Sequence, residues 1–141
     1  MHNAQRYAFT TVETQLGEAR FRPNLPLTLA YQDRSVAVSG LLDTGAVINV
    51  LPYQVGIDLG VVWEEQTIAI RLTGNLARYE ARILIVQAVV GRFESVPLVF
   101  AWSKAPAVPL LLGQVNFFMQ FDACFYRSEL YFEVRPHQTP A

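Results

Sequence analysis

Apolar and polar residues alternate over short stretches of this chain, and turn residues close each stretch. Residues 36–42, 79–86 and 129–134 show the pattern clearly, and aromatic and β-branched side chains are frequent in them. A period of two residues is typical of strands that bury one face, and these side chains favour an extended backbone. The sequence therefore predicts an all-β fold.

Two further stretches favour helices. Residues 53–59 are followed by a glycine, and a glycine in the left-handed conformation commonly ends a helix. In residues 114–121, Val115, Phe118 and Met119 recur at the three- and four-residue spacing of one helical face. We expect a short helix in each place.

A long hairpin is predicted over residues 67–86. Residues 67–72 and 79–86 both alternate in polarity, and between them lie Gly74 and Asn75, which tolerate the tight backbone of a turn. The expected hairpin therefore has a glycine-containing tip.

Composition limits the functional classes. The 141 residues are 52% hydrophobic and 16% charged, which suits one domain, 1–141, with an ordered core over roughly 20–135 and flexible polar ends, 1–6 and 136–141. Eleven basic and twelve acidic residues give a net charge of −1, so no broad positive field favours nucleic acid or an anionic membrane. No apolar run reaches the ~20 residues of a membrane-spanning helix. The start carries no visible secretory signal, so we expect no membrane insertion and a cytoplasmic location.

The sequence does not indicate a metal or cofactor site. Cys124 is the single cysteine, which excludes an intrachain disulfide and a thiolate-rich metal site. His2 and His137 lie in the polar ends, where solvated side chains are the ordinary case. We predict no metal and no cofactor.

Asp43 combines an ionisable side chain with apolar neighbours and a tight turn. It follows two leucines and precedes Thr44, Gly45 and Ala46. A carboxylate at the end of a buried strand carries a desolvation cost unless backbone N–H groups, a hydroxyl or a shared proton offset it. Gly45 lets the backbone pass close to the carboxylate, so the turn can supply such donors. The simplest alternative is that Asp43 only caps a turn, because Asp, Thr and Gly are ordinary turn residues.

Four features in this order resemble the retropepsin-like aspartic proteases. They are the Asp-Thr-Gly-Ala turn at Asp43, the glycine-tipped hairpin, the apolar-apolar-glycine run at residues 111–113 before a predicted helix, and a closing strand. The resemblance covers residues 26–134, and residues 41–60 are similar to small bacterial members. It implies a closed, barrel-like single lobe with a flap hairpin and one short C-terminal helix.

The resemblance also implies roles for individual residues. Asp43 matches the catalytic aspartate, Thr44 the residue whose hydroxyl locks the two active-site loops, and Gly45 the backbone that receives substrate. Residues 72–79 match the flap, and residues 112–113 pass beneath the catalytic turn. The expected substrate-binding residues are Ala46, Val47, Ile48, Leu72, Thr73, Gly74, Asn75, Leu112 and Gly113.

Two positions depart from the family pattern. Retroviral members commonly pair an acidic residue after the Asp-Thr-Gly-Ala turn with an arginine after the apolar-apolar-glycine run. Here these positions hold Val47 and Gln114. Both partners are missing together, so no buried charge is left unpaired. The departure bears on the strength of a dimer more than on the chemistry.

Aspartic protease chemistry needs two carboxylates ~3 Å apart, which share one proton and activate a water molecule. The other aspartates, Asp33, Asp58 and Asp122, lack the Thr-Gly sequel. We therefore expect a two-fold homodimer, with Asp43 from each protomer, that acts as an aspartic endopeptidase on polypeptides at mildly acidic pH. A catalytically silent peptide-binding or assembly module with the same fold is the alternative. A β-barrel carrier of small ligands would leave the Asp43 turn unexplained.

Overall fold

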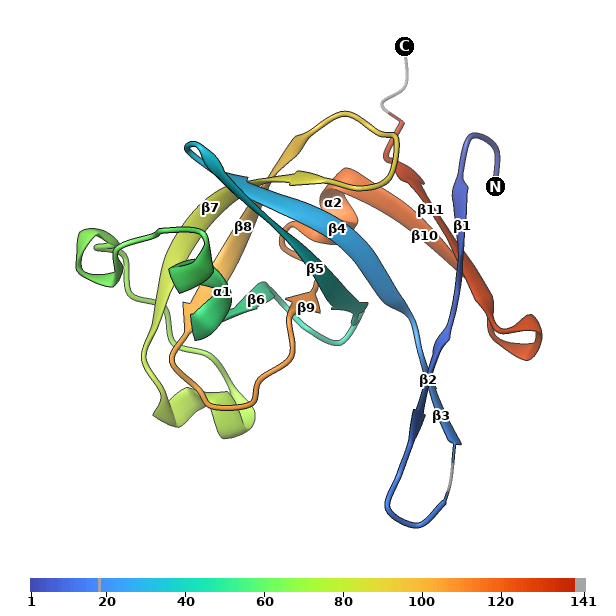
Figure 1. Ribbon diagram of the computed structural model, residues 1–141, viewed down its shortest axis with the longest axis horizontal. Coiled ribbons are helices and arrows are strands. Elements are labelled where there is room, and N and C mark those ends of the chain that lie inside the picture. Colours follow the sequence, from blue (N-terminus) through green and yellow to red (C-terminus); the bar gives the residue numbers. More distant parts are fainter. Residues whose placement is uncertain (18, 139–141) are drawn as a thin grey trace.

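Six strands close into a barrel in the computed structural model, which describes residues 1–17 and 19–138 (Figure 1). Around the barrel the order is β4-β5-β9-β6-β8-β7. Their bounds are β4 (Asn24–Tyr31), β5 (Arg34–Leu42), β6 (Asn49–Pro52), β7 (Ala81–Val89), β8 (Val96–Ser103) and β9 (Leu111–Leu112). The prediction of an all-β, closed and barrel-like fold is confirmed.

The barrel is mixed in direction. β4 with β5 and β7 with β8 are antiparallel hairpins, whereas β9 runs parallel to β5 and β6 runs parallel to β8. Alternate residues of the long strands fill the interior, and Leu29, Leu98 and Phe100 are completely buried there. The parallel pairing of β9 with β5 and its antiparallel pairing with β6 place these three strands side by side in the barrel.

The helix expected at residues 53–59 is present as α1 (Tyr53–Asp58). Gly60, two residues after its last residue, has a φ of +78°. It lies against the barrel because the indole of Trp102 donates to the carbonyl of Tyr53 (3.0 Å). The 3₁₀ helix η1 (Trp63–Glu65) follows, and the Trp63 ring packs edge-on to Trp102. These aromatic rings close the outside of the barrel beside β8.

The expected strand over residues 67–72 does not form. Only a single bridge between Ala69 and Arg82 and two flanking backbone hydrogen bonds join this stretch to one edge of β7, whose opposite edge pairs with β8. The chain then enters the 3₁₀ helix η2 (Gly74–Arg78), where the glycine-containing tip of the hairpin was expected. Gly74 has φ +64°, so its position does require a residue that tolerates the left-handed region.

The helix expected over residues 114–121 is shorter, spanning only α2 (Phe117–Gln120). The backbone N–H groups of Gln114 and Val115 bind carbonyls of the loop after Asp43 in place of helical partners. The expected apolar face is therefore wrong: Phe117 is buried, whereas Met119 is 64% exposed. Tertiary hydrogen bonds override the helical spacing here.

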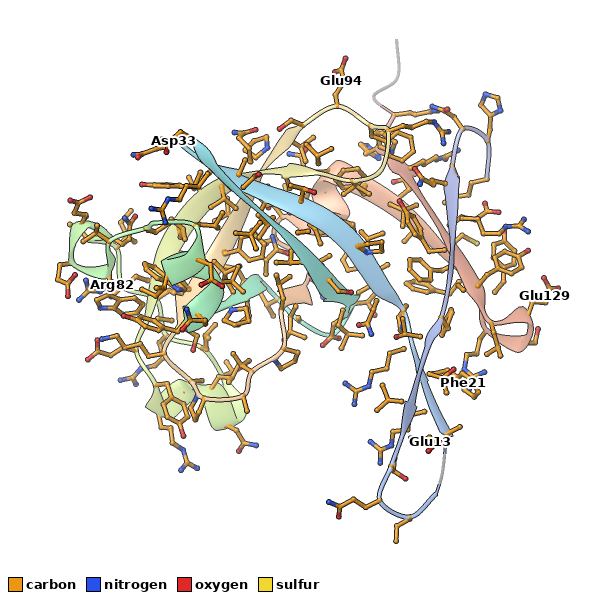
Figure 2. All side chains as sticks on the ribbon, viewed as in Figure 1. Glu13, Phe21, Asp33, Arg82, Glu94 and Glu129 are labelled. Carbon is orange, nitrogen blue, oxygen red and sulfur yellow. The ribbon has the colours of Figure 1, made fainter. Side chains whose placement is uncertain are left out.

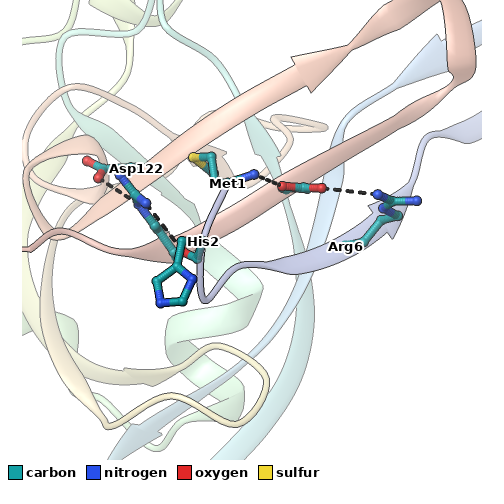
Figure 3. Close-up of polar contacts among 6 residues, drawn as sticks. Met1, His2, Arg6 and Asp122 are labelled. Carbon is teal, nitrogen blue, oxygen red and sulfur yellow. Dashed lines mark hydrogen bonds and ion pairs between the residues drawn. The ribbon is translucent and has the colours of Figure 1, made fainter.

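The N-terminus is tied down, in place of the flexible polar end that composition suggests. β1 (Gln5–Ala8) pairs with β11 (Tyr131–Pro136), which also pairs with β10 (Phe121–Tyr126). The Met1 ammonium lies 2.6 Å from Glu133 Oε2, and Arg6 Nη2 lies 3.2 Å from Oε1 (Figure 3). At the other end, β11 stops at Pro136, and the last residues of the expected flexible tail, 139–141, lie outside the described residues.

A further hairpin, β2 (Thr10–Glu13) with β3 (Ala19–Arg22), projects from the barrel (Figures 1 and 2). The Arg127 guanidinium, in the 3₁₀ helix η3 (Arg127–Glu129), lies 5.1 Å from the ring centre of Phe21 near its base. Among the described residues, no helix has the length and apolar character needed to cross a bilayer.

The Glu133 cluster makes stability depend on pH. Hydrogen bonding to the N-terminal ammonium holds the pKa of Glu133 below its usual 4.5, and Arg6 acts in the same direction. Because the folded-state pKa is lowered, the stabilisation is present above that usual value and is lost as the pH falls through the folded-state pKa. We expect Glu133→Gln to lower the Tm at neutral pH, by an amount that shrinks on acidification.

The measurement is thermal unfolding of the wild type, Glu133→Gln and the exposed control Glu94→Gln at a series of pH values. A Tm difference for Glu133→Gln that stays constant between about pH 7 and about pH 3 would contradict this account of the cluster.

Candidate active site

The Asp43 turn begins where β5 ends. The Asp43 N–H donates to the Leu112 carbonyl (2.9 Å), and the Ala46 N–H closes the turn on the Asp43 carbonyl (3.1 Å). The Gly45 N–H donates to Asp43 Oδ1 (2.9 Å). Within the described part of the chain, Asp43 Oδ2 accepts no hydrogen bond. One carboxylate oxygen is therefore held by the backbone and the other is left for a ligand.

Gly113 lies directly beneath this turn. A Cβ at residue 113 would lie 2.6 Å from the Ala46 carbonyl oxygen and 3.0 Å from that of Ile48, so only glycine fits. The N–H groups of Gln114 and Val115 donate to the carbonyls of Ala46 and Val47 (both 2.9 Å). The stretch after β9 thus runs alongside the loop after Asp43, and these hydrogen bonds hold the loop in place.

A pair of asparagines joins the two layers. Asn49, fully buried in β6, accepts from the Gly113 N–H (2.8 Å) and donates to Asn116 Oδ1 (3.1 Å) and to the Val99 carbonyl (2.9 Å). Asn116 Oδ1 also accepts from the Val99 N–H (2.9 Å). Because a buried amide is costly unless it is hydrogen-bonded, this network specifies one arrangement of β6, β8 and β9.

Gln114 and Val47 occupy the two positions that depart from the family pattern. The Gln114 Nε2 donates to the Thr44 carbonyl (2.8 Å), so a neutral brace within one chain occupies the place of the arginine. Val47, at the position of the acidic residue, is 67% exposed. The turn is thus braced without an ion pair.

A cleft of ≈ 430 Å³ opens above the turn and includes Asp43 in its wall. Most of the rest of the wall is aliphatic. The lining residues are Asp43, Gly45, Ala46, Val47, Ile48, Val50, Ile70, Arg71, Leu72, Thr73, Leu76, Leu111 and Val115. Val50 and Leu72 also belong to a small buried cluster with Ala81 and Ala101, which supports the cleft from behind.

The structure brings together some of the expected site residues and separates others. Asp43 and Gly45 line the cleft, while Thr44 is exposed beside it. Of the expected substrate-binding residues, those in the cleft wall are Ala46, Val47, Ile48, Leu72 and Thr73. Those outside the cleft wall are Gly74, Asn75, Leu112 and Gly113.

Leu112 was expected to line the cleft but points to the other face of its strand. Successive side chains of a strand point to opposite faces, and in β9 Leu112 is completely buried while Leu111 faces the cleft. Gly113 acts through its close contact with the turn. Gly74 and Asn75 lie in η2, of which only Leu76 reaches the cleft wall.

Sequence reasoning missed six lining residues: Val50, Ile70, Arg71, Leu76, Leu111 and Val115. The alternation of Ile70 with Leu72 was a signal for Ile70, because both side chains share one side of an extended segment. Val115 gave no such signal, since its spacing indicated a helical core position.

Other reactive side chains lie elsewhere. Cys124 is half-buried in β10, and its side-chain hydrogen bond is the main cause that raises the pKa of Tyr126 to about 12. His137 Nδ1 lies 3.0 Å from Asp122 Oδ1, and Arg135 lies on the other oxygen. Across residues 1–17 and 19–138, no group of three or more His, Cys, Asp or Glu side chains could hold a metal ion.

Comparison of whole folds identifies a similar solved structure, a retropepsin-like aspartic protease from Rickettsia conorii. The TM-score is 0.61 with 13% sequence identity, over 95% of this chain and 94% of that chain. No protein-family model and no curated protein sequence matches the chain. The likeness establishes that the barrel has the fold of a retropepsin-like single lobe.

We expect Asn49→Ala to destabilise the protein by about 2–4 kcal/mol, because it leaves the buried Gly113 N–H without its acceptor and takes one donor from Asn116 Oδ1 and from the Val99 carbonyl. Urea unfolding of Asn49→Ala, Asn116→Ala and the double variant measures the coupling of the two amides. The double variant should lose less stability than the sum of the two single losses. Strict additivity would show that the two side chains do not act as one network.

Proposed function

We propose that the protein is an aspartic endopeptidase, in which two copies of the whole chain, acting as one retropepsin-like domain each, contribute one Asp43 carboxylate apiece. The observation that carries this proposal is the Asp43 carboxylate itself, set in an apolar cleft with Oδ1 bound by the Gly45 N–H and Oδ2 without a donor among the described residues. The fold shared with the Rickettsia conorii protease supports it.

The chemistry follows from bringing two such carboxylates together. Two carboxylates ~3 Å apart cannot both ionise readily, so one keeps a proton and the other acts as a base toward a water molecule between them. The water attacks the peptide carbonyl, and the protonated carboxyl group donates first a hydrogen bond and then a proton. In this scheme the Thr44 hydroxyl bonds the partner's loop, and Gly45 receives the substrate backbone.

A second carboxylate has to come from a second chain. Asp33 lies in the β4–β5 turn, Asp58 ends α1, and Asp122 is bound by Arg135 and His137. None of these three aspartates lines the cleft. A symmetric dimer with Asp43 on its axis supplies the missing group.

Exposed apolar side chains beside Asp43 support this dimer. Val47 is 67% exposed and Val115 is 42% exposed, and their backbones are hydrogen-bonded to each other. Large aliphatic groups left in water at the edge of a carboxylate-bearing cleft favour burial against another surface. A second copy placed across Asp43 would cover both.

The substrate class is an extended polypeptide. The cleft wall offers aliphatic contacts from Val47, Ile48 and Leu72, and Ala46 and Thr73 also line it. Strand-like binding places alternate side chains in such pockets. Gly74 and Asn75 in η2, next to the lining residues Thr73 and Leu76, are the proposed closing segment, while Leu112 and Gly113 support the Asp43 turn from below.

A silent peptide-binding module remains the second candidate. It is favoured by the presence of a single carboxylate in the cleft of one chain, because an apolar cleft can hold an extended peptide without hydrolysing it.

Asp43→Asn is expected to abolish cleavage of a diverse peptide mixture, by at least about a thousandfold, because the shared proton and the base are both lost. Asp33→Asn, a matched change in an exposed turn, should leave the rate unchanged. Wild-type activity should peak at mildly acidic pH, whereas a flat profile between about pH 5 and about pH 9 would contradict a shared-proton pair.

Mixing wild-type and Asp43→Asn chains tests whether one site needs two chains. With freely exchanging protomers, activity should follow the square of the wild-type fraction, because only wild-type pairs hold two carboxylates. A linear dependence on that fraction would mean that a single chain is sufficient. Specific activity should also rise with total protein concentration.

A further inference from the structure

A second cavity adjoins the cleft. It has a volume of ≈ 660 Å³ and lies between residues 69–71 and residues 77–82. Ile70 and Arg71 line both the cavity and the cleft. A chain lying in the cleft can therefore continue into the cavity within a few residues, since an extended peptide advances ~3.3 Å per residue.

This cavity is positively charged, although the whole chain carries a net charge of −1. Its wall holds the guanidinium groups of Arg71, Arg78 and Arg82 against the single carboxylate of Glu80. Among the described ion pairs, none involves Arg71 or Arg78, and both side chains are exposed. Two guanidinium groups are thus available to a ligand.

Arg82 is held in place at the back of this site. Its Nη1 donates to the Trp63 carbonyl (2.7 Å) and its guanidinium lies 4.7 Å from the centre of the Trp63 ring. Lys104 Nζ lies 4.6 Å from the same ring, and the Lys104 N–H donates to the Glu80 carbonyl (2.9 Å). Figure 2 shows Arg82 on the side of the barrel that carries α1 and η1. One aromatic ring therefore contacts two cations, Arg82 and Lys104.

We propose that the cavity is a subsite for an acidic side chain, so that the peptides bound carry aliphatic residues in the cleft and an Asp or Glu a few positions away. The proposal rests on the peptide-binding cleft of the proposed function. Guanidinium groups bind carboxylates through paired, charge-assisted hydrogen bonds, which suits Arg71 and Arg78 better than it suits a neutral side chain. Glu64 and Glu65, the acidic residues of η1, do not line the cavity.

Binding to Asp43→Asn chains separates this proposal from catalysis. Fluorescent peptides with aliphatic residues at the centre are prepared in pairs, with Glu or Gln at one position moved stepwise along the peptide. We expect one position at which Glu binds about 5- to 10-fold more tightly than Gln. The gain should be lost in Arg71→Gln and Arg78→Gln, and retained in the exposed control Arg20→Gln.

Each other outcome is decisive. Equal affinity for Glu and Gln peptides at every position overturns the subsite, and so does an equal gain at all positions, which would reflect general charge attraction. If wild-type chains bind the Glu peptide with the predicted preference but cut no peptide, the subsite stands and the proposed hydrolysis fails. A gain that persists in both arginine variants would also overturn the proposal.

Discussion

The contact between Gly113 and the carbonyls of Ala46 and Ile48 is the constraint on which the site depends. It lets β9 pass close enough beneath the Asp43 turn for its carbonyl and N–H groups to replace water around the turn. Because β9 is parallel to β5 and antiparallel to β6, this crossing also closes the barrel. The same few residues therefore join the fold and position the carboxylate.

The polar groups around this crossing are of two kinds: some are hydrogen-bonded within the protein, and others have no protein partner among the described residues. The amides of Asn49 and Asn116 are hydrogen-bonded to each other and hold β6 against the segment after β9. The Gln114 amide is hydrogen-bonded to the Asp43 turn. Among the described residues, Asp43 Oδ2 accepts no hydrogen bond, and Arg71 and Arg78, which line the adjoining cavity, are in no ion pair. Available charge next to an apolar cleft is the arrangement of a binding site, whereas satisfied charge is the arrangement of a scaffold.

The parts that sequence predicted are those governed by local chemistry. Neighbouring residues determine the alternation in residues 36–42 and the turn at Asp43. The same holds for the end of α1, which lies two residues before Gly60. The misses came from long-range pairing. Residues 67–72 have strand alternation but form only one bridge with β7, and the helical spacing after β9 yields to hydrogen bonds with the loop after Asp43. Leu111 and Leu112 could not be told apart before the register of β9 was known.

In the proposed mechanism, one catalytic site is formed by two chains, which contribute one Asp43 each. A peptide with a secondary alcohol in place of the scissile amide mimics the tetrahedral intermediate and cannot be cut, so its binding can be titrated by calorimetry. We expect a stoichiometry of one such peptide for every two chains, with an affinity for the alcohol-containing peptide that is much weaker in Asp43→Asn. A stoichiometry of one peptide per chain, with affinity unchanged by Asp43→Asn, would contradict it.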